Sequence, residues 1–225
     1  MRIGLLGGTF NPIHRCHLRI AHHAQQALEL DQILFIPSGD PPHKSQHVLV
    51  PAHHRLEMVR RAISAYPSFA VSEIEIHTPH KSYTINTIEA LQQERPGDHL
   101  WFLVGLDAFC DFPTWKEAKA LLHMVNIVVL SRPPYFFAQL AALPLLPPLP
   151  TTQLEALDTG SLTRLEIPLS PHTTLTLLRI PPCQISASAI RKRLQAGLSV
   201  ADWLPPSVES YIMQFNLYQS KKGGG

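Results

Sequence analysis

Short apolar runs alternate with helix-like stretches along most of the chain, and this alternation restricts the fold more than any other feature of the sequence. Branched and aromatic residues mark candidate strands at residues 2–6, 33–37, 69–76, 100–104, 127–130 and 174–180. Candidate helices lie at residues 17–30, 51–65, 84–94, 115–123 and 187–196, and Pro205-Pro206 opens a last one that runs to about residue 215. Strands that alternate with helices of this length form parallel βαβ units.

The handedness of βαβ units narrows the architecture further. Right-handed crossovers predict an α/β fold with a Rossmann-like, doubly wound, mostly parallel sheet of order 3-2-1-4-5 plus a further strand, and helices on both faces. We expect a single domain over residues 1–218, because the irregular proline- and leucine-rich insertion at residues 133–172 is too short to build its own core. Within it, a short helix is expected near Gln139. Residues 219–225 are expected to form a disordered tail.

Composition excludes several classes of protein. The 225 residues carry a formal net charge of +2, and the densest basic cluster, Arg191-Lys192-Arg193, is too short for the basic stripe of a nucleic-acid binder. The apolar run at residues 3–6 is too short for a signal peptide or a membrane span. The three cysteines are odd in number and widely spaced, which predicts no disulfide framework and a reducing, cytoplasmic location. The oligomeric state stays open, a homo-oligomer included.

The segment after the first predicted strand has the residues of a phosphate site. Gly7-Gly8-Thr9 lets backbone N–H groups approach a phosphate closely, and the helix that begins near His14 adds a positive dipole end. His14 and His17 are three residues apart and share one helix face in that first turn. Imidazoles placed there can donate to phosphoryl oxygens during transfer.

Ordinary turns, metal sites and other nucleotide motifs account for this segment less well. Glycine pairs also serve tight turns, and one histidine pair among 13 histidines could arise by coincidence. A zinc protease motif needs two histidines four apart with an intervening glutamate, a Walker A loop needs a lysine that is absent, and a dinucleotide fingerprint needs GxGxxG. The phosphate site is therefore favoured.

The run Gly-Gly-Thr-Phe-Asn-Pro-x-His-x-x-His at residues 7–17 resembles the signature of the HxGH nucleotidyltransferase superfamily, and later motifs resemble those of its bacterial nicotinate-nucleotide adenylyltransferases. The resemblance implies a Rossmann-like fold, ATP with Mg²⁺, and direct in-line attack without a covalent enzyme intermediate. Two positions depart from the family: Asn11 stands where aspartate is more common, and Cys16 replaces the glycine between the histidines. Cys16 bears on how closely this turn can approach the nucleotide.

Two further segments complete the predicted ATP site. The fourth strand runs into Gly105-Leu106-Asp107, which in the order 3-2-1-4-5 lies beside the end of the first strand at the topological switch point. Asp107 is either a helix N-cap or, as the resemblance implies, a neighbour of the ribose and the acceptor. The segment at residues 185–191 matches the family's second signature and opens another helix. The predicted ATP-binding residues are Gly7, Gly8, Thr9, Phe10, His14, His17, Gly105, Asp107, Ser131, Arg132, Ile185, Ser186, Ser188 and Arg191.

Arg191 lies one turn into that helix and can neutralise the leaving pyrophosphate. The helical pattern alone favours an ordinary surface arginine on a capped helix, and the rest of the chain favours the functional role. His14, His17 and Arg191 are the predicted catalytic residues, with His17 the stronger candidate for transition-state stabilisation. No protein metal ligand is predicted, because Mg²⁺ would bridge phosphate oxygens.

The acceptor side is predicted from three segments. Lys44, in a proline-stiffened loop, can meet the acceptor phosphate, or it is an ordinary solvated lysine. Ser82-Tyr83-Thr84 opens a helix whose free N–H groups can hold a carboxylate. Trp115 lies near the Asp107 loop and can stack on a pyridine ring, and Asp107 is counted on this side too. The family's nicotinate mononucleotide enzymes carry matching residues.

The predicted reaction is adenylyl transfer from ATP to nicotinate mononucleotide, which gives nicotinate adenine dinucleotide and pyrophosphate in NAD biosynthesis. The acceptor phosphate is already an anion at neutral pH, so catalysis needs positioning and charge stabilisation rather than a general base. The alternatives are a nucleotidyltransferase that acts on another phosphorylated acceptor, such as nicotinamide mononucleotide or pantetheine phosphate, and a nucleotide-binding protein without turnover.

Overall fold

The computed structural model describes residues 1–39, 49–78 and 82–219. The strands are β1 (Arg2–Gly8), β2 (Gln32–Pro37), β3 (Phe69–Val71), β4 (His99–Gly105), β5 (Asn126–Leu130), β6 (Arg164–Pro168) and β7 (Thr174–Leu178). They form one seven-stranded sheet in the order β3-β2-β1-β4-β5-β7-β6. The predicted order 3-2-1-4-5 and the doubly wound, mostly parallel class are therefore confirmed.

The helices largely follow the predicted segments. They are α1 (Arg15–Leu28), α2 (Ala52–Ile63), α3 (Thr84–Glu94), α4 (Leu106–Cys110), α5 (Ala118–Met124), α6 (Thr151–Thr159), α7 (Ala187–Gln195) and α8 (Pro206–Gln214), with short 3-10 helices η2 (Phe112–Thr114) and η3 (Phe137–Ala142). α1 shows why: Leu18, Ala21, Ala24 and Leu28 recur at helical spacing and are all buried. Among the described residues, no helix is long and apolar enough to cross a membrane.

The chain divides into two compact units. Unit one comprises Met1–Gly7, His23–Ile33 and Tyr83–Pro182, and unit two comprises Gly8–His22, Leu34–Ser82 and Cys183–Gly225. The assignment of residues 1–218 to a single domain stays a prediction, as does the disorder of the tail, of which residues 220–225 lie outside the described part.

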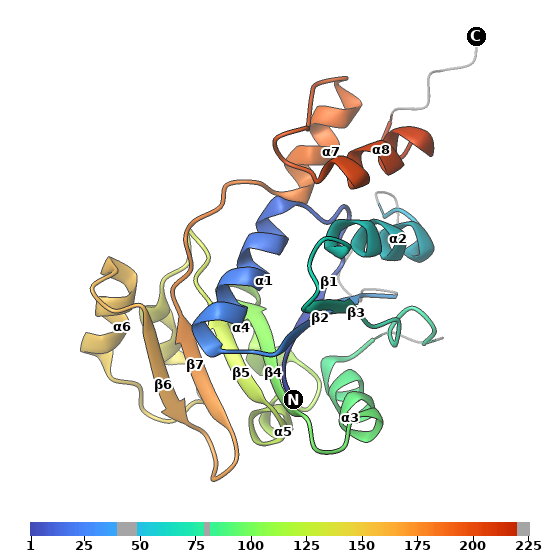
Figure 1. Cartoon of the computed structure of the whole chain (residues 1–225). Helices are drawn as coiled ribbons and strands as arrows, with labels where there is room; N and C mark the ends of the chain where they lie inside the picture. The colour runs from blue at the N-terminus through green and yellow to red at the C-terminus, as the bar shows by residue number, and fades with distance from the viewer. Residues whose placement is uncertain (40–48, 79–81, 220–225) are drawn as a thin grey trace. The chain divides into compact units, whose positions relative to one another are not determined.

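Unit one contains the parallel centre of the sheet. β1 pairs with β4, β4 with β5, and β5 with β7, all in parallel register. These neighbouring strands are seen side by side in Figure 1, with β6 at the edge beyond β7. In β5 and β7 every residue after the first is buried, Thr176 included, as expected for strands covered on both faces.

The insertion at residues 133–172 holds more regular structure than expected. The predicted short helix near Gln139 exists as η3, but α6 and the antiparallel strand β6, which pairs with β7, were not foreseen. The prolines that precede α6 and the proline that ends β6 made the segment look irregular. The predicted strand at residues 69–76 was too long, since β3 ends at Val71.

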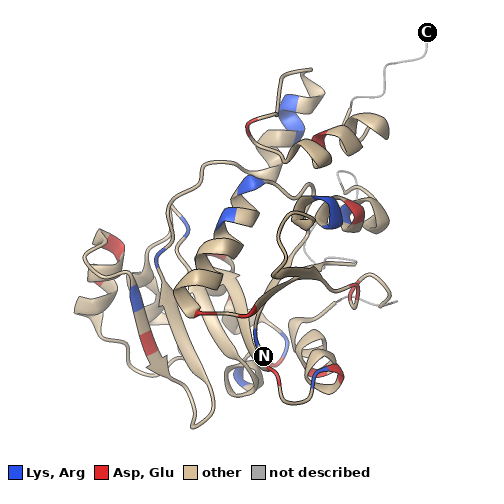
Figure 2. Cartoon of the chain, in the orientation of Figure 1, with Lys and Arg blue, Asp and Glu red and all other residues tan. Residues whose placement is uncertain are grey.

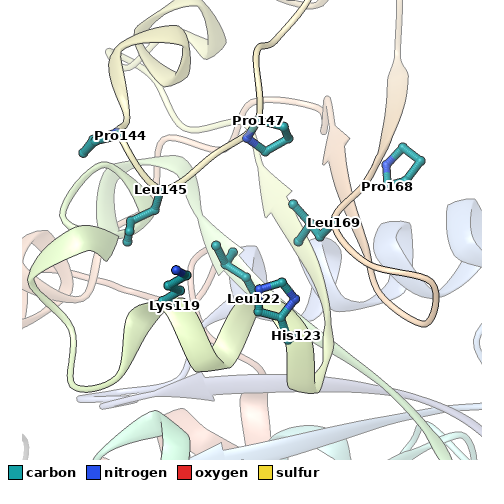
Figure 3. Close-up of a pocket in the computed structure, with 8 residues that line it drawn as sticks. All are labelled: Lys119, Leu122, His123, Pro144, Leu145, Pro147, Pro168 and Leu169. Carbon is teal, nitrogen blue, oxygen red and sulfur yellow. The ribbon is translucent and has the colours of Figure 1, made fainter.

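The insertion also forms a wall of a pocket in unit one. The pocket has a volume of about 340 Å³, and α5 supplies Lys119, Leu122 and His123 to its lining. Facing them in Figure 3 are apolar side chains from the insertion, namely Pro144, Leu145, Pro147, Pro168 and Leu169. Of the predicted site residues that the structure describes, none lines this pocket.

Candidate nucleotide and acceptor site

The turn that follows β1, residues 8–11 (the β1 turn), leads directly into the two predicted histidines in unit two. His14 immediately precedes α1, and its backbone N–H donates to Nδ1 of His17 at 3.2 Å. The two imidazole rings stack with centroids 3.8 Å apart, and the ring of Phe10 meets His17 edge-on at 5.1 Å. The expectation that the two rings share one face at the start of the helix is therefore confirmed.

Asn11 joins the β1 turn to the remainder of unit two. Its carbonyl oxygen accepts a hydrogen bond from Nη1 of Arg191 at 2.8 Å. Its side-chain Oδ1 accepts from the backbone N–H of Val50 at 3.3 Å and from the hydroxyl of Tyr218 at 2.8 Å. Asn11 is buried, so these contacts fix the turn in a protected position. From the sequence alone, Asn11 was only a departure from a signature, and this role was missed.

The helix start at residues 185–188 is built as predicted. The side chain of Ser186 caps α7 by accepting from the backbone N–H of Ala189 at 3.2 Å, and its hydroxyl lies 3.1 Å from that of Ser188. Ile185 and Arg191 are half-buried. Within the described part of the chain, no group accepts a hydrogen bond from the buried Nε of Arg191. The guanidinium thus keeps a donor for an anion while Nη1 holds the β1 turn.

Unit one carries the other half of the predicted ATP residues at the carboxyl ends of three adjacent parallel strands. Gly7 lies near the end of β1, Gly105 ends β4, and Ser131 follows β5. A Cβ atom on Gly105 would lie 2.5 Å from Oδ1 of Asp107, so a larger residue would displace that carboxylate. This is the switch-point arrangement that the strand order predicted.

Residues 105–107 (the β4 turn) present a charged pair. Asp107 lies in the first turn of α4 and is not its N-cap, which is Gly105, so the capping alternative is wrong. Nε of Arg132 lies 3.2 Å from Oδ2 of Asp107, and the two side chains are 51% and 37% exposed. Ser131 is engaged differently: its Oγ accepts from the backbone N–H of Ile180 at 2.9 Å. A contact of Ser131 with the nucleotide stays a prediction.

The predicted acceptor residues occupy both units, with Ser82 in unit two and Tyr83, Thr84 and Trp115 in unit one. Tyr83 is the N-cap of α3, and its side chain makes no cap hydrogen bond to the first N–H groups of this helix. Trp115 is half-buried against the rings of Phe102 and Phe112. Lys44 lies outside the described residues.

Lys116 is a candidate acceptor residue that sequence reasoning missed. Its Nζ lies 5.1 Å from the ring centroid of Tyr83 and 3.4 Å from Oδ1 of Asn86 in α3. It therefore brings a cation to the helix start where a carboxylate was expected. Its position directly after Trp115 was the available signal.

The expectation that the cysteines are not joined by a disulfide was wrong, whereas the reducing, cytoplasmic location stays a prediction. Cys16 and Cys183 form a disulfide within unit two, with Cα atoms 5.8 Å apart, a normal spacing for such a bond. Cys16 is only 2% exposed and lies in the first turn of α1, between the two histidines. Cys110 is free. Sequence spacing could not reveal the pair because 167 positions separate its members.

Solved structures share this fold. A Plasmodium falciparum nicotinic acid mononucleotide adenylyltransferase complexed with NaAD superimposes with a TM-score of 0.70 at 20% identity, over 96% of this chain and 97% of that chain. A putatively assigned nicotinate-nucleotide adenylyltransferase from Vibrio parahaemolyticus gives a TM-score of 0.63 at 15% identity, over 97% and 96% of the two chains.

Sequence relatives are more similar. A protein of Trichlorobacter lovleyi named "Probable nicotinate-nucleotide adenylyltransferase" is 41% identical over 97% of this chain and 100% of its own. A Geobacter metallireducens protein of the same name is 41% identical over 97% and 98%. The profile of the cytidylyltransferase-like family matches residues 5–193, which include the β1 turn, the β4 turn and Arg191. This chain therefore belongs to the cytidylyltransferase-like family.

Proposed function

We propose that this enzyme transfers the adenylyl group of ATP to nicotinate mononucleotide and thereby forms nicotinate adenine dinucleotide and pyrophosphate in NAD biosynthesis. The observation that carries the proposal is the stacked pair His14 and His17 at the start of α1, linked through Asn11 to Arg191. The full-length relatives share about two-fifths of the sequence, and their names support nicotinate mononucleotide as the acceptor.

The chemistry follows from the charges involved. A phosphate oxygen of the acceptor attacks the α-phosphorus of ATP, the bond to the β,γ-phosphates breaks, and pyrophosphate leaves with its electron pair. His17 and His14 would donate to phosphate oxygens as charge moves, and Arg191 would neutralise the leaving group through its uncommitted Nε. Positioned donors of this kind stabilise the transition state without a general base.

A divalent cation fits this site, and we propose Mg²⁺. Asp107 offers a half-exposed carboxylate, which is the hard oxygen donor that Mg²⁺ prefers, while phosphate oxygens and water would supply most of its ligands. Bound with ATP, the ion would supply charge neutralisation on the phosphates. The backbone N–H groups after Gly7 would bind phosphate oxygens of the nucleotide.

The acid form of the acceptor is favoured by the helix start at Tyr83-Thr84. Free N–H groups at the first turn of α3 attract a carboxylate, and the ammonium group of Lys116 lies beside them. Trp115 would stack on the pyridine ring. We also propose a cytoplasmic location, in which the Cys16–Cys183 disulfide would be exposed to thiol reductants.

Pyrophosphate release tests the proposal. The protein is incubated with ATP and Mg²⁺ and, in separate reactions, with nicotinate mononucleotide, nicotinamide mononucleotide or pantetheine phosphate. We expect release with the nicotinate compound at a kcat/KM at least about tenfold above that with the amide. Equal or better use of the amide would overturn the acceptor assignment, and no release with any acceptor would leave only nucleotide binding.

A further inference from the structure

Arg55 is a fully buried cation that the proposed chemistry does not use. It lies on α2 and is 0% exposed, whereas Arg60 and Arg61 of the same helix lie nearer solvent and pair with Glu73 and Glu57. The mixture of acidic and basic positions on α2 is visible in Figure 2. Burial of a guanidinium is costly unless its donors are satisfied, so its contacts should have a specific purpose.

The donors of Arg55 reach three separate segments of unit two. Nη1 donates to the carbonyl of Thr9 at 2.8 Å, Nη2 to the carbonyl of Gly39 at 2.9 Å, and Nε to the carbonyl of Val50 at 3.0 Å. Burial lowers the pKa of this guanidinium from its ordinary value, which still leaves it a cation at neutral pH. One side chain thus ties the β1 turn to the chain after β2 and to the chain before α2.

Tyr218 approaches the same turn from the C-terminal end of the chain. Its hydroxyl donates to Oδ1 of Asn11 at 2.8 Å. Its φ of +64° lies in the left-handed region, which is unfavourable for an aromatic residue and is held only where surrounding contacts require it. Burial raises the pKa of the phenol, so the hydroxyl stays protonated and remains a donor.

Val50 and Asn11 connect these two anchors. The carbonyl of Val50 accepts from Arg55, while its N–H donates to Oδ1 of Asn11. Asn11 in turn accepts from Arg191 through its own carbonyl. A displacement of either anchor therefore reaches the guanidinium of Arg191 through a continuous set of partly buried hydrogen bonds.

We propose that Arg55 and Tyr218 are positioning residues, which hold the β1 turn so that Asn11 orients Arg191 toward the leaving pyrophosphate. The inference rests on the proposed adenylyl transfer. Neither residue touches the substrate. Each acts through Asn11 or through the backbone of Thr9, so their loss should reduce turnover through Arg191 and leave the other groups in place.

Tyr218→Phe tests one anchor by removing a single hydroxyl. We expect kcat/KM for ATP to fall about tenfold, the loss that corresponds to one buried hydrogen bond. Tyr211→Phe is the matched control, because Tyr211 also lies in unit two and its hydroxyl lies 2.8 Å from Nδ1 of His54 rather than near the β1 turn. The control should lose similar thermal stability and keep kcat/KM within twofold. Equal kinetic effects in the two variants would overturn the proposal.

Arg55→Lys tests the other anchor. Lysine keeps the charge but lacks the planar fork that reaches three carbonyls, so we expect kcat/KM for ATP to fall about 100-fold. Arg60→Lys, on the exposed side of α2, should change it less than twofold. If Arg55→Lys does not fold, the comparison of Tyr218→Phe with Tyr211→Phe still tests the proposal. Wild-type kinetics from a folded Arg55→Lys protein would refute the role of Arg55.

A double-mutant cycle separates positioning from general destabilisation. In an Arg191→Ala background, Tyr218→Phe should lower kcat/KM less than threefold, because the group it orients is gone. A full tenfold loss in that background would show that Tyr218 acts elsewhere. Wild-type protein with nicotinate mononucleotide is the reference throughout. An inactive wild type would count against the proposed function, whereas an active wild type with additive variants would count only against the positioning role.

Discussion

The β1 turn and the β4 turn carry the two predicted halves of the nucleotide site, and they are held in different ways. In unit two, the β1 turn is fixed by Arg55, Tyr218, Arg191 and Val50 through Thr9 and Asn11. In unit one, the β4 turn presents Asp107, whose partner Arg132 is half exposed. Buried, satisfied hydrogen bonds resist displacement, whereas an exposed ion pair contributes little and is readily exchanged.

We propose from this difference that the two turns have different tasks. A turn that is fixed before substrate arrives suits phosphate chemistry, where donors must already be in place when charge moves. A turn with an exchangeable ion pair suits substrate binding, because Asp107 can leave Arg132 for a ribose hydroxyl or a metal ion. Substitutions in and around each turn can overturn or refine this contrast.

The largest effect is expected from His17→Ala. Loss of a donor to the transition state should lower kcat about 100- to 1,000-fold, while the melting temperature changes little because His17 is half-buried. Steady-state pyrophosphate release measures the effect, with the exposed His22→Ala of the same helix as the control. Normal turnover per folded molecule in His17→Ala would show that the histidine is structural, and the proposed contrast between the β1 turn and the β4 turn would then be wrong.

For Asp107→Asn, in the β4 turn, we expect mainly a rise in KM.

Reduction of the Cys16–Cys183 disulfide should destabilise unit two by up to about 5 kcal/mol, since the bond closes a long loop. Urea unfolding with and without dithiothreitol measures this, and the Cys16→Ser, Cys183→Ser double variant should match the reduced protein. Cys110→Ser, in unit one, serves as the control. If dithiothreitol leaves the wild-type transition unchanged, the disulfide contributes nothing to the stability of unit two.

Asn11→Ala compares the two turns directly. It leaves the N–H of Val50 and the hydroxyl of Tyr218 without their acceptor, so we expect a loss of about 2 kcal/mol in unfolding free energy. Arg132→Ala removes only the exposed partner of Asp107 and should cost less than about 1 kcal/mol. Chemical denaturation of both variants checks the difference, and equal losses would show that the β1 turn is held no more firmly than the β4 turn.

The smallest effect is a pH dependence from His54, next to Arg55 on α2. Burial, and then neighbouring His53, lowers its pKa from 6.5, so the unfolded chain binds a proton more readily than the folded one. Its contribution to stability is therefore present above pH 6.5 and is lost as the pH falls from there toward the folded pKa. Unfolding free energies between pH 5 and pH 8 should fall less steeply at the acid end in His54→Gln than in the wild type. An unchanged slope would remove His54 as the cause, and His22→Gln is the exposed control.

The local sequence pattern correctly predicted those elements whose structure depends only on neighbouring residues. The limits of α3 and the cap of α7 by Ser186 follow from short-range chemistry, and the central strand order follows from the handedness of crossovers. The local pattern did not predict β6 in the insertion. This antiparallel edge strand ends in a proline, and its pairing with β7 depends on contacts that are distant from its own residues.

The amino-acid pattern alone was enough for the doubly wound sheet, the histidine pair at the start of α1 and the strand ends that carry Gly7 and Gly105. Only the folded chain establishes which groups hold the β1 turn. Arg55 and Tyr218 meet it from positions 46 residues (Arg55 to Thr9) and 207 residues (Tyr218 to Asn11) away, and Cys183 joins Cys16 across 167. The physical reason is burial: a buried arginine or tyrosine is defined by the acceptors that folding brings to it, and sequence spacing carries no record of them.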